Sequence, residues 1–265
     1  MDADWFVCAM PAERARMLWN REILDLDPTL AAMNNLVTDW MNGIQFYLTA
    51  DTPITNGHLG FIDSPWALSA LNQGQFWKSR DLARDYGDGT VRDILSVDIS
   101  DWNTPGILYG KPAMDCTREQ IAAETWAQIQ AGLYGKNKAL LRDDCVHSWY
   151  LDPAIQWSNT EGRNTNDEPL LINTAGSWDQ RPTTHTNIPN LFLAGDYVRT
   201  NIDLATMEGA NESGRAAANA ILDATGSNAE PATVFQLNRL PQFEPAKQLD
   251  RQRYAAGQPH LLDTP

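Results

Sequence analysis

The first apolar run of the chain is residues 5–10, which follow the polar residues 1–4. Because the run has no polar alternation, it predicts a strand buried on both faces. Pro11 suits the first turn of a helix, which residues 12–18 can continue. A core strand this early leaves two explanations open: a short N-terminus, or a preceding part of the domain that lies elsewhere.

Between about residues 26 and 150, short apolar runs alternate with turn-forming residues. The turn signals are the pairs Asn56-Gly57 and Asp88-Gly89, whose residues tolerate the positive φ of tight hairpins. The pattern therefore predicts a mostly antiparallel sheet, with strands at 45–48, 58–62, 67–76 and 91–99.

One amphipathic helix interrupts this region. Thr117 and Gln120 have the spacing of a capping box, in which each side chain binds the other residue's backbone N–H. The apolar residues that follow recur on a single helical face: Ala122, Trp126, Ile129 and Leu133.

A short apolar strand at 191–194 ends in Gly195 and Asp196. Glycine allows a tight turn or the close approach of a ligand, because it has no Cβ. Asp196 follows the carboxyl end of a strand, where open α/β sheets bind ligands. Its carboxylate can accept hydrogen bonds from ribose or ribityl hydroxyls, or it can simply cap a turn or helix; spacing does not decide between these.

A helix is expected to begin near Met207. One face has mostly small residues, so this helix can pack very close to a sheet or a flat ligand: Ala210, Gly214, Ala217, Ala218 and Ile221. Its first turn exposes unpaired N–H groups and the positive end of the helix dipole. Such a helix start can stabilise the electron-rich edge of a reduced flavin ring. We interpret Glu208 as complementing the dipole.

Composition narrows the classes of function. The chain has 265 residues, with 20 basic residues against 34 acidic ones, so its formal charge of -14 argues against a nucleic-acid partner. No apolar run approaches the roughly 18 residues of a membrane-spanning helix. The acidic residues 2–4 are unlike a signal peptide. We therefore expect a cytoplasmic protein, with peripheral membrane association left open.

Cysteine and tryptophan usage bear on chemistry. The 3 cysteines are scattered and form neither a disulfide framework nor a CxxC metal site. No metal site is predicted. The 10 tryptophans can line an apolar tunnel, but a packed core explains them with fewer assumptions.

The segment 191–218 resembles the C-terminal FAD-binding signature of the flavin amine oxidase superfamily. The residues that carry the resemblance read Leu-Phe-Leu-Ala-Gly-Asp-Tyr, then Met-Glu-Gly-Ala, then Ser-Gly-Arg-Ala-Ala. Within the superfamily, the chain is most similar to the branch of phytoene desaturase, ζ-carotene desaturase and hydroxysqualene dehydroxylase. Residues 4–11 and 42–47 and the Pro-rich tail also resemble this branch. The similarity corresponds to the second half of the family's usual length.

The chain departs from the family in one respect. Family members bind FAD chiefly through an N-terminal GxGxxG unit, whose glycines and helix start cradle the pyrophosphate. Here only Gly87-Asp88-Gly89 gives GxG, and Arg92 occupies the position of the third glycine. We therefore expect a truncated reading frame or a separate polypeptide that supplies the first half, and weak or no FAD binding by the chain alone.

The resemblance implies roles for five residues in cofactor binding. Asp196 matches the carboxylate that contacts the ribityl-phosphate part of FAD, and Gly195 matches the turn before it. Met207 matches the backbone contact to the isoalloxazine, and Gly209 and Ala210 match the close-packed helix start.

The resemblance places Trp178 near the flavin, where it can wall a substrate tunnel, although a structural role is as well supported. Flavin-dependent desaturation removes a hydride and a proton from a C–C bond, and the cofactor performs the demanding step. No catalytic base can be assigned from sequence. The candidate proton acceptors, for each of which an ordinary role is favoured, are His58, His147, His185, Asp63 and Asp179.

The resulting expectation is an α/β fold, part of a Rossmann-like FAD-binding domain, with an antiparallel-sheet α+β substrate domain. Residues 1–25 and 165–225 would form the FAD-domain portion, 26–164 the substrate-domain segment, and 226–265 an extended Pro-rich strap. The polar segment 158–168 is the candidate boundary. The expected activity is FAD-dependent oxidation of an isoprenoid or carotenoid-like hydrophobic molecule. Two alternatives are amine oxidation and a catalytically silent partner subunit of a split flavoprotein.

Overall fold

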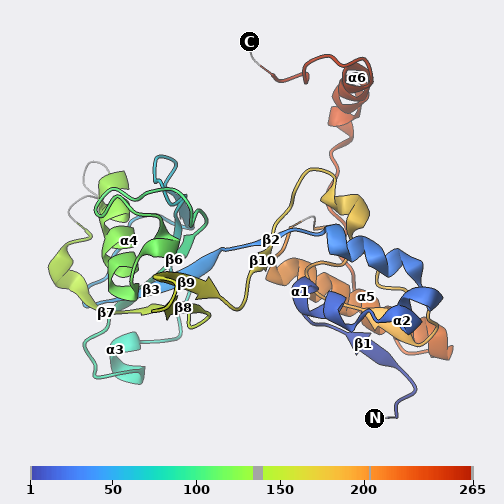
Figure 1. Cartoon of the computed structure of the whole chain (residues 1–265), viewed down its shortest axis with the longest axis horizontal. Coiled ribbons are helices and arrows are strands. Elements are labelled where there is room, and N and C mark those ends of the chain that lie inside the picture. Colours follow the sequence, from blue (N-terminus) through green and yellow to red (C-terminus); the bar gives the residue numbers. More distant parts are fainter. Residues whose placement is uncertain (1, 134–139, 203, 264–265) are drawn as a thin grey trace. The chain divides into compact units, whose positions relative to one another are not determined.

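The computed structural model describes residues 2–133, 140–202 and 204–263. The chain divides into two compact units (Figure 1). Unit 1 comprises residues 1–36 and 173–265, and unit 2 comprises residues 37–172. Each unit is described by itself.

A five-stranded antiparallel sheet organises unit 2, in the order β4-β5-β6-β3-β7. The strands are β3 (Asn42–Leu48), β4 (His58–Gly60), β5 (Ser69–Asn72), β6 (Asp93–Ile99) and β7 (Val146–Leu151). In β3, Ile44, Phe46 and Leu48 are buried and alternate with partly exposed residues, as a sheet covered on one face requires. The predicted antiparallel sheet is confirmed, although the strand expected at 67–76 extends only over β5.

Helix α4 (Arg118–Gly132) covers the buried face of this sheet. Its predicted capping box is present: the Gln120 N–H donates to the Thr117 hydroxyl, and the Thr117 N–H donates to the Gln120 side chain. The four apolar residues predicted to share one face are all buried. Trp126 lies against Phe46 of β3, with ring centroids 5.0 Å apart. The packed core therefore joins α4 directly to strand β3.

Smaller elements complete unit 2. Strand β2 (Thr38–Asp39) pairs with β10 (Leu170–Leu171), and β8 (Ile155–Ser158) with β9 (Arg163–Asn166). Helix α3 (Leu82–Asp85) lies between β5 and β6, and two 3-10 turns are η3 (Ala113–Asp115) and η5 (Asp143–Cys145). The polar segment 158–168 thus contains the turn and second strand of a hairpin. The chain divides instead at 36/37 and 172/173, while the assignment of FAD and substrate domains stays a prediction.

Unit 1 is built around a parallel pair of strands, β1 (Phe6–Cys8) and β11 (Leu191–Leu193). Helix α5 (Met207–Thr225) packs against β11. The other elements are α1 (Ala12–Ala15), η1 (Arg16–Leu18), α2 (Arg21–Leu26), η2 (Pro28–Asn35) and η6 (Ser177–Gln180). The mixture of helices with antiparallel sheets agrees with the expected fold class; the Rossmann-like arrangement stays a prediction.

The expectation that β1 is buried on both faces is wrong for this chain. The side chains of Phe6 and Val7 are 41% and 46% exposed, and only Cys8 is buried. Among the described residues, β11 is the one strand that pairs with β1, so the other edge of β1 is unpaired. The apolar sequence of β1 is typical of a strand buried on both faces. Within the described residues, nothing buries the side chains of Phe6 and Val7.

The predicted buried face of α5 is also rotated. Gly214 and Ala218 are exposed, whereas the buried residues are Gly209, Ser213, Ala217 and Ala220. The two sets share only Ala217. The physical reason is Ser213, a polar residue that a hydrophobicity pattern assigns to solvent but that the fold buries by hydrogen bonding it to the backbone.

The Pro-rich tail is not extended throughout. Residues 244–255 form helix α6 (Glu244–Ala255), preceded by η7 (Pro241–Phe243). Pro245 lies in the first turn of α6, where its missing N–H costs no intrahelical hydrogen bond. Residues 232–235 do lie along α5: the Asn219 side-chain amide bonds both backbone groups of Ala232, and Arg215 donates to the Thr233 carbonyl.

All three cysteines are free and buried. Within the described residues, no helix is both long and apolar enough to cross a membrane.

Candidate functional site

The turn after β11 requires glycine at position 195. Gly195 has φ of +126°, a conformation that side-chain-bearing residues rarely adopt. A Cβ at this position would lie 2.8 Å from the Tyr197 ring. Tyr197 is itself fixed, since it is buried and its hydroxyl donates to the Cys8 carbonyl of β1. The prediction of a tight turn at Gly195 is thus confirmed.

Ser213 joins this turn to α5. Its hydroxyl oxygen accepts from the Gly195 N–H at 2.8 Å. The Ser213 hydroxyl also donates to the carbonyls of Gly195 and Ala210, whose oxygens lie 2.9 and 2.8 Å from its own oxygen. Ser213 is fully buried, so these bonds replace those that the backbone groups would make to water. The end of β11 is therefore fixed against the second turn of α5.

Asp196 follows directly and is half-buried. Burial raises the pKa of its carboxyl group above the ordinary 3.8, while the Arg181 guanidinium and the N–H groups of Asp196 and Tyr197 oppose the rise. Burial has the largest effect. Hydrogen bonds from hydroxyl donors would favour the ionised carboxylate and would further oppose the rise in its pKa.

The start of α5 is capped and closely packed at Gly209. Thr206 caps the helix by accepting from the Gly209 N–H at 3.1 Å. Gly209 is buried, and a Cβ there would lie 3.1 Å from the Leu204 carbonyl oxygen. Met207 is 84% exposed and Ala210 is partly buried. The first turn thus combines close packing at Gly209 with an exposed side chain at Met207, at the positive end of a 19-residue helix.

Polar contacts hold the loop between Asp196 and α5. Glu212 of α5 accepts from the backbone and side-chain amides of Asn201, at 2.6 and 2.9 Å. The Arg199 N–H donates to the Pro182 carbonyl, and its guanidinium donates to the Asp179 carbonyl. The second pair of contacts ties the loop to η6, which carries Trp178.

Trp178 itself is 37% exposed on η6. The left-handed Gly176, with φ of +78°, precedes η6. Neighbouring Arg181 is almost completely buried and donates to the Asn173 side chain at 2.9 Å. An exposed indole on an anchored turn agrees with contact to a ligand and equally with a surface residue, so its substrate role stays a prediction.

The structure thus links two of the six predicted residues, Gly195 and Ala210, through the Ser213 hydroxyl, and Asp196 and Gly209 are their neighbours in sequence. Met207 lies at the exposed start of α5, and Trp178 is linked to the junction through Arg199. Sequence reasoning missed Ser213, Thr206 and Glu212. For Ser213 a signal existed, because it follows Gly209 at i+4 on the face that proves to be buried.

The five candidate proton acceptors are all exposed. His147 contacts Ser148 and Asp88, at 2.9 and 3.2 Å. No catalytic base is assigned. A search of the described residues found no group of three or more His, Cys, Asp or Glu side chains that could hold a metal ion.

Comparison with known proteins identifies the family of the chain. No curated protein matches the chain. The model of the family described as flavin containing amine oxidoreductase matches residues 1–222, which span β1, all of unit 2 and most of α5. Members of this family are flavin-dependent oxidoreductases, which agrees with FAD as the cofactor. The chain belongs to the family of flavin-containing amine oxidoreductases.

Proposed function

We propose that unit 1 binds the isoalloxazine and ribityl side of FAD, in an oxidoreductase that accepts a hydride from a hydrophobic substrate. One observation carries the proposal: Ser213 fixes Gly195 against α5, so Asp196 directly follows a turn that is fixed to this helix. The first turn of a helix has backbone N–H groups without intrahelical partners. These are the two complementary features that a flavin requires, an acceptor for hydroxyls and a donor edge for the ring.

The residues present fit the cofactor in kind. Asp196 is a partly buried acceptor whose ionised form hydroxyl donors would stabilise. Gly195, in the turn after β11, and Gly209, in the first turn of α5, have no Cβ that would crowd neighbouring atoms. The N-terminus of α5 adds positive potential without a charged side chain. When bound, FAD supplies the hydride acceptor; the chain binds it, orients it and stabilises negative charge at the ring edge.

We further propose that a second polypeptide segment with GxGxxG completes the cofactor site. The chain has no such fingerprint to cradle the pyrophosphate. The exposed apolar side chains of Phe6 and Val7 and the unpaired edge of β1 support the proposal, because they offer a parallel strand to pair with. Residues 1–25 and 165–225 then belong to an FAD domain and residues 26–164 to a substrate domain.

For the substrate we propose an isoprenoid or carotenoid-like molecule, on the strength of the resemblance in residues 191–218. A second candidate is an amine, which the description of the matching family favours. The two differ in what is oxidised: a C–C bond loses a hydride and a proton in the first, and a C–N bond in the second.

The test is co-expression of the chain with a polypeptide that carries GxGxxG, followed by the visible absorption spectrum of the purified complex. We expect bound FAD in the complex and little in the chain alone. Stoichiometric FAD on the solitary chain would contradict the proposed second segment. A colourless complex would contradict the proposed cofactor site and favour a silent partner subunit.

Anaerobic mixing of the yellow complex with a polyisoprenoid or with benzylamine separates the two substrate classes. Bleaching of the flavin band by the polyisoprenoid alone is the expected result. Bleaching by benzylamine alone would replace the first candidate with the second. A matched control is the complex with Asp196→Asn, which should load less FAD while retaining the fold.

A further inference from the structure

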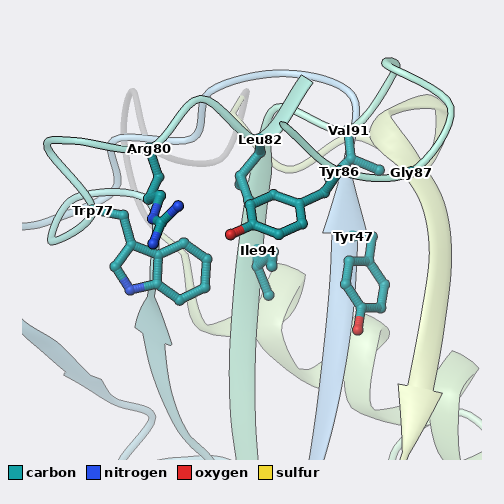
Figure 2. A pocket seen from close by; sticks show the side chains of 8 residues that line it. All are labelled: Tyr47, Trp77, Arg80, Leu82, Tyr86, Gly87, Val91 and Ile94. Atoms are coloured by element: carbon teal, nitrogen blue, oxygen red, sulfur yellow. The ribbon is translucent and has the colours of Figure 1, made fainter. Parts of the chain in front are cut away.

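A cavity of about 480 Å³ opens on unit 2, above the ends of β3 and β6. Figure 2 shows the Trp77 indole and the Arg80 side chain on one side, the Tyr47 ring on the other, and the Tyr86 ring between them above Ile94. The volume falls within the range of about 300–1,000 Å³ that is usual for small-molecule pockets.

The rim of the cavity is anchored. A turn in which the Arg80 N–H donates to the Trp77 carbonyl at 3.0 Å sets the indole and the guanidinium together on one side. The Trp77 N–H in turn donates to the Gly74 carbonyl, and the Arg92 N–H ties the far end of the rim to Leu48 of β3. The arrangement is therefore held by backbone hydrogen bonds at both ends.

The walls are aromatic and remain accessible. Trp77 is 39% exposed and Tyr86 is 52% exposed, while Ile94 and Leu82 are buried beneath the opening. Large apolar side chains left open around a concave surface are typical of a binding site rather than of a finished core. The contrast with Trp66 and Trp102, which are completely enclosed in the core of the same unit, supports this interpretation.

Arg80 is the one charged side chain among the residues that line the cavity. No ion pair to it occurs among the described residues. The neighbouring carboxylates are engaged elsewhere: Asp81 caps α3 by accepting from the Arg84 N–H, and Asp85 pairs with the Arg84 guanidinium at 2.7 Å. The Arg80 charge does act on Asp85, whose pKa is lowered chiefly by Arg84 and also by Arg80, and Arg80 lines a neighbouring cavity with Asp51, Asp81 and Asp93. Its guanidinium nevertheless lies at an aromatic wall, where it can pair with a ligand.

We propose that this cavity binds a planar aromatic carboxylate. The rings of Trp77, Tyr86 and Tyr47 suit a flat ring system, since offset and edge-on ring contacts are favourable. The guanidinium matches a carboxylate by two parallel hydrogen bonds. A single cation within an otherwise apolar lining suits one negative charge, and a phosphate would bring more charge than the lining residues can neutralise. The site lies wholly in unit 2 and does not depend on the proposed flavin site.

The probes are naphthoate, naphthamide and naphthylmethylamine, all substituted at the same ring carbon and titrated calorimetrically into the full chain. These compounds share the ring and differ in charge: negative, neutral and positive. We expect naphthoate to bind most tightly and naphthylmethylamine most weakly. Equal affinities, or no binding by naphthoate, would overturn the proposal.

Variants locate the site. Arg80→Gln should weaken naphthoate binding about tenfold, as expected for loss of a charge-assisted pair, and should leave naphthamide within about twofold. The matched control is Lys78→Gln, which removes the same charge from an exposed side chain outside the cavity and should leave both affinities unchanged. Equal losses in the two variants would contradict a local role for Arg80.

The aromatic wall is tested separately. Trp77→Ala should weaken naphthoate and naphthamide alike, about fivefold, and Trp77→Phe should restore most of the affinity. Circular dichroism checks that each variant is folded. We expect it to be, because the side chains of Trp77 and Arg80 are exposed. Unchanged binding of both probes by folded Trp77→Ala would refute this placement of the ligand.

Discussion

The two units of the chain differ in how their interiors are built. Unit 2 has a continuous core in which large side chains such as Phe46, Trp66 and Trp102 are almost completely enclosed between the sheet and α4. At the strands of unit 1, the cluster consists of Phe192 with the small residues Ala194, Ala217 and Ala220, and β1 leaves Phe6 and Val7 exposed. The sheet of unit 2 thus has one face covered by a continuous core, whereas the strand pair of unit 1 leaves the apolar side chains of Phe6 and Val7 exposed.

Two carboxylates, one from each unit, differ in how far the fold satisfies them. In unit 2, the completely buried Glu124 accepts from the N–H groups of Ile107, Leu108 and Tyr109 and from the Gln128 side chain. In unit 1, burial raises the pKa of Asp196. A carboxylate whose hydrogen bonds are satisfied by the fold stabilises it, and one that burial disfavours is available for a ligand.

The largest expected effect tests the completed core of unit 2. Trp66→Ala should lower the free energy of unfolding by about 3–5 kcal/mol, because it leaves a large cavity and removes the indole bond to the Thr104 carbonyl. Urea denaturation followed by circular dichroism measures the change. Trp77→Ala, at a half-exposed position, should cost less than about 1 kcal/mol. Similar losses of unfolding free energy in the two variants would contradict the assignment of Trp66 to the core and Trp77 to the cavity wall.

Next in size is Glu124→Gln. The substitution removes the negative charge that three backbone N–H groups share, and its amide can leave one of them facing another donor. We expect a loss of about 2–3 kcal/mol of unfolding free energy. The exposed Glu161→Gln serves as the control and should change stability by less than about 0.5 kcal/mol. A neutral result at position 124 would show that this loop is not held by the carboxylate.

A matched pair of glycines tests the junction in unit 1. Gly195→Ala should cost about 2 kcal/mol, since its φ is positive and its Cβ would press on the Tyr197 ring. Gly214→Ala, on the exposed face of α5 with open space around it, should instead stabilise by about 0.5–1 kcal/mol. Thermal unfolding of both variants measures the difference. Destabilisation by Gly214→Ala would mean that the buried face of α5 is placed wrongly.

The smallest effect concerns Asp196→Asn. Burial raises the pKa of Asp196 in the folded state, so the folded protein holds this proton more tightly than the unfolded chain does. Stability is therefore lost as the pH rises from the ordinary value of 3.8 through the raised pKa. We expect the Asp196→Asn variant to be slightly more stable than the unsubstituted chain at neutral pH and equally stable below pH 3.8. A gain confined to acidic pH would contradict the sign of the shift.

Local signals in the sequence predicted much of unit 2 correctly. The capping box of Thr117 and Gln120 and the face of Ala122 and Trp126 are encoded within a few residues, as are the alternating strands. The signals failed where tertiary contacts decide the outcome. A hydrophobicity pattern cannot show that Ser213 is buried by bonding Gly195, and it marks Pro245 as a breaker although the first turn of a helix accepts proline.

For the candidate site, the sequence identified the glycines and the carboxylate but not what holds them. Gly195, Asp196 and Gly209 follow from strand and helix ends. The contacts of Glu212 with Asn201 and of Arg199 with Asp179 join segments that no sequence period relates. For β1, the apolar sequence indicated that the strand needs cover, but it left open whether the same chain supplies that cover.

Hydrogen exchange measured by mass spectrometry, with and without FAD, tests the central claim most directly. The sample is the complex of the full chain with the GxGxxG polypeptide. The account predicts that FAD slows exchange at the backbone amides of residues 195–197 and 207–210, around the junction of Gly195 with α5. Protection that appears elsewhere in the chain and leaves both of these segments unchanged would contradict it.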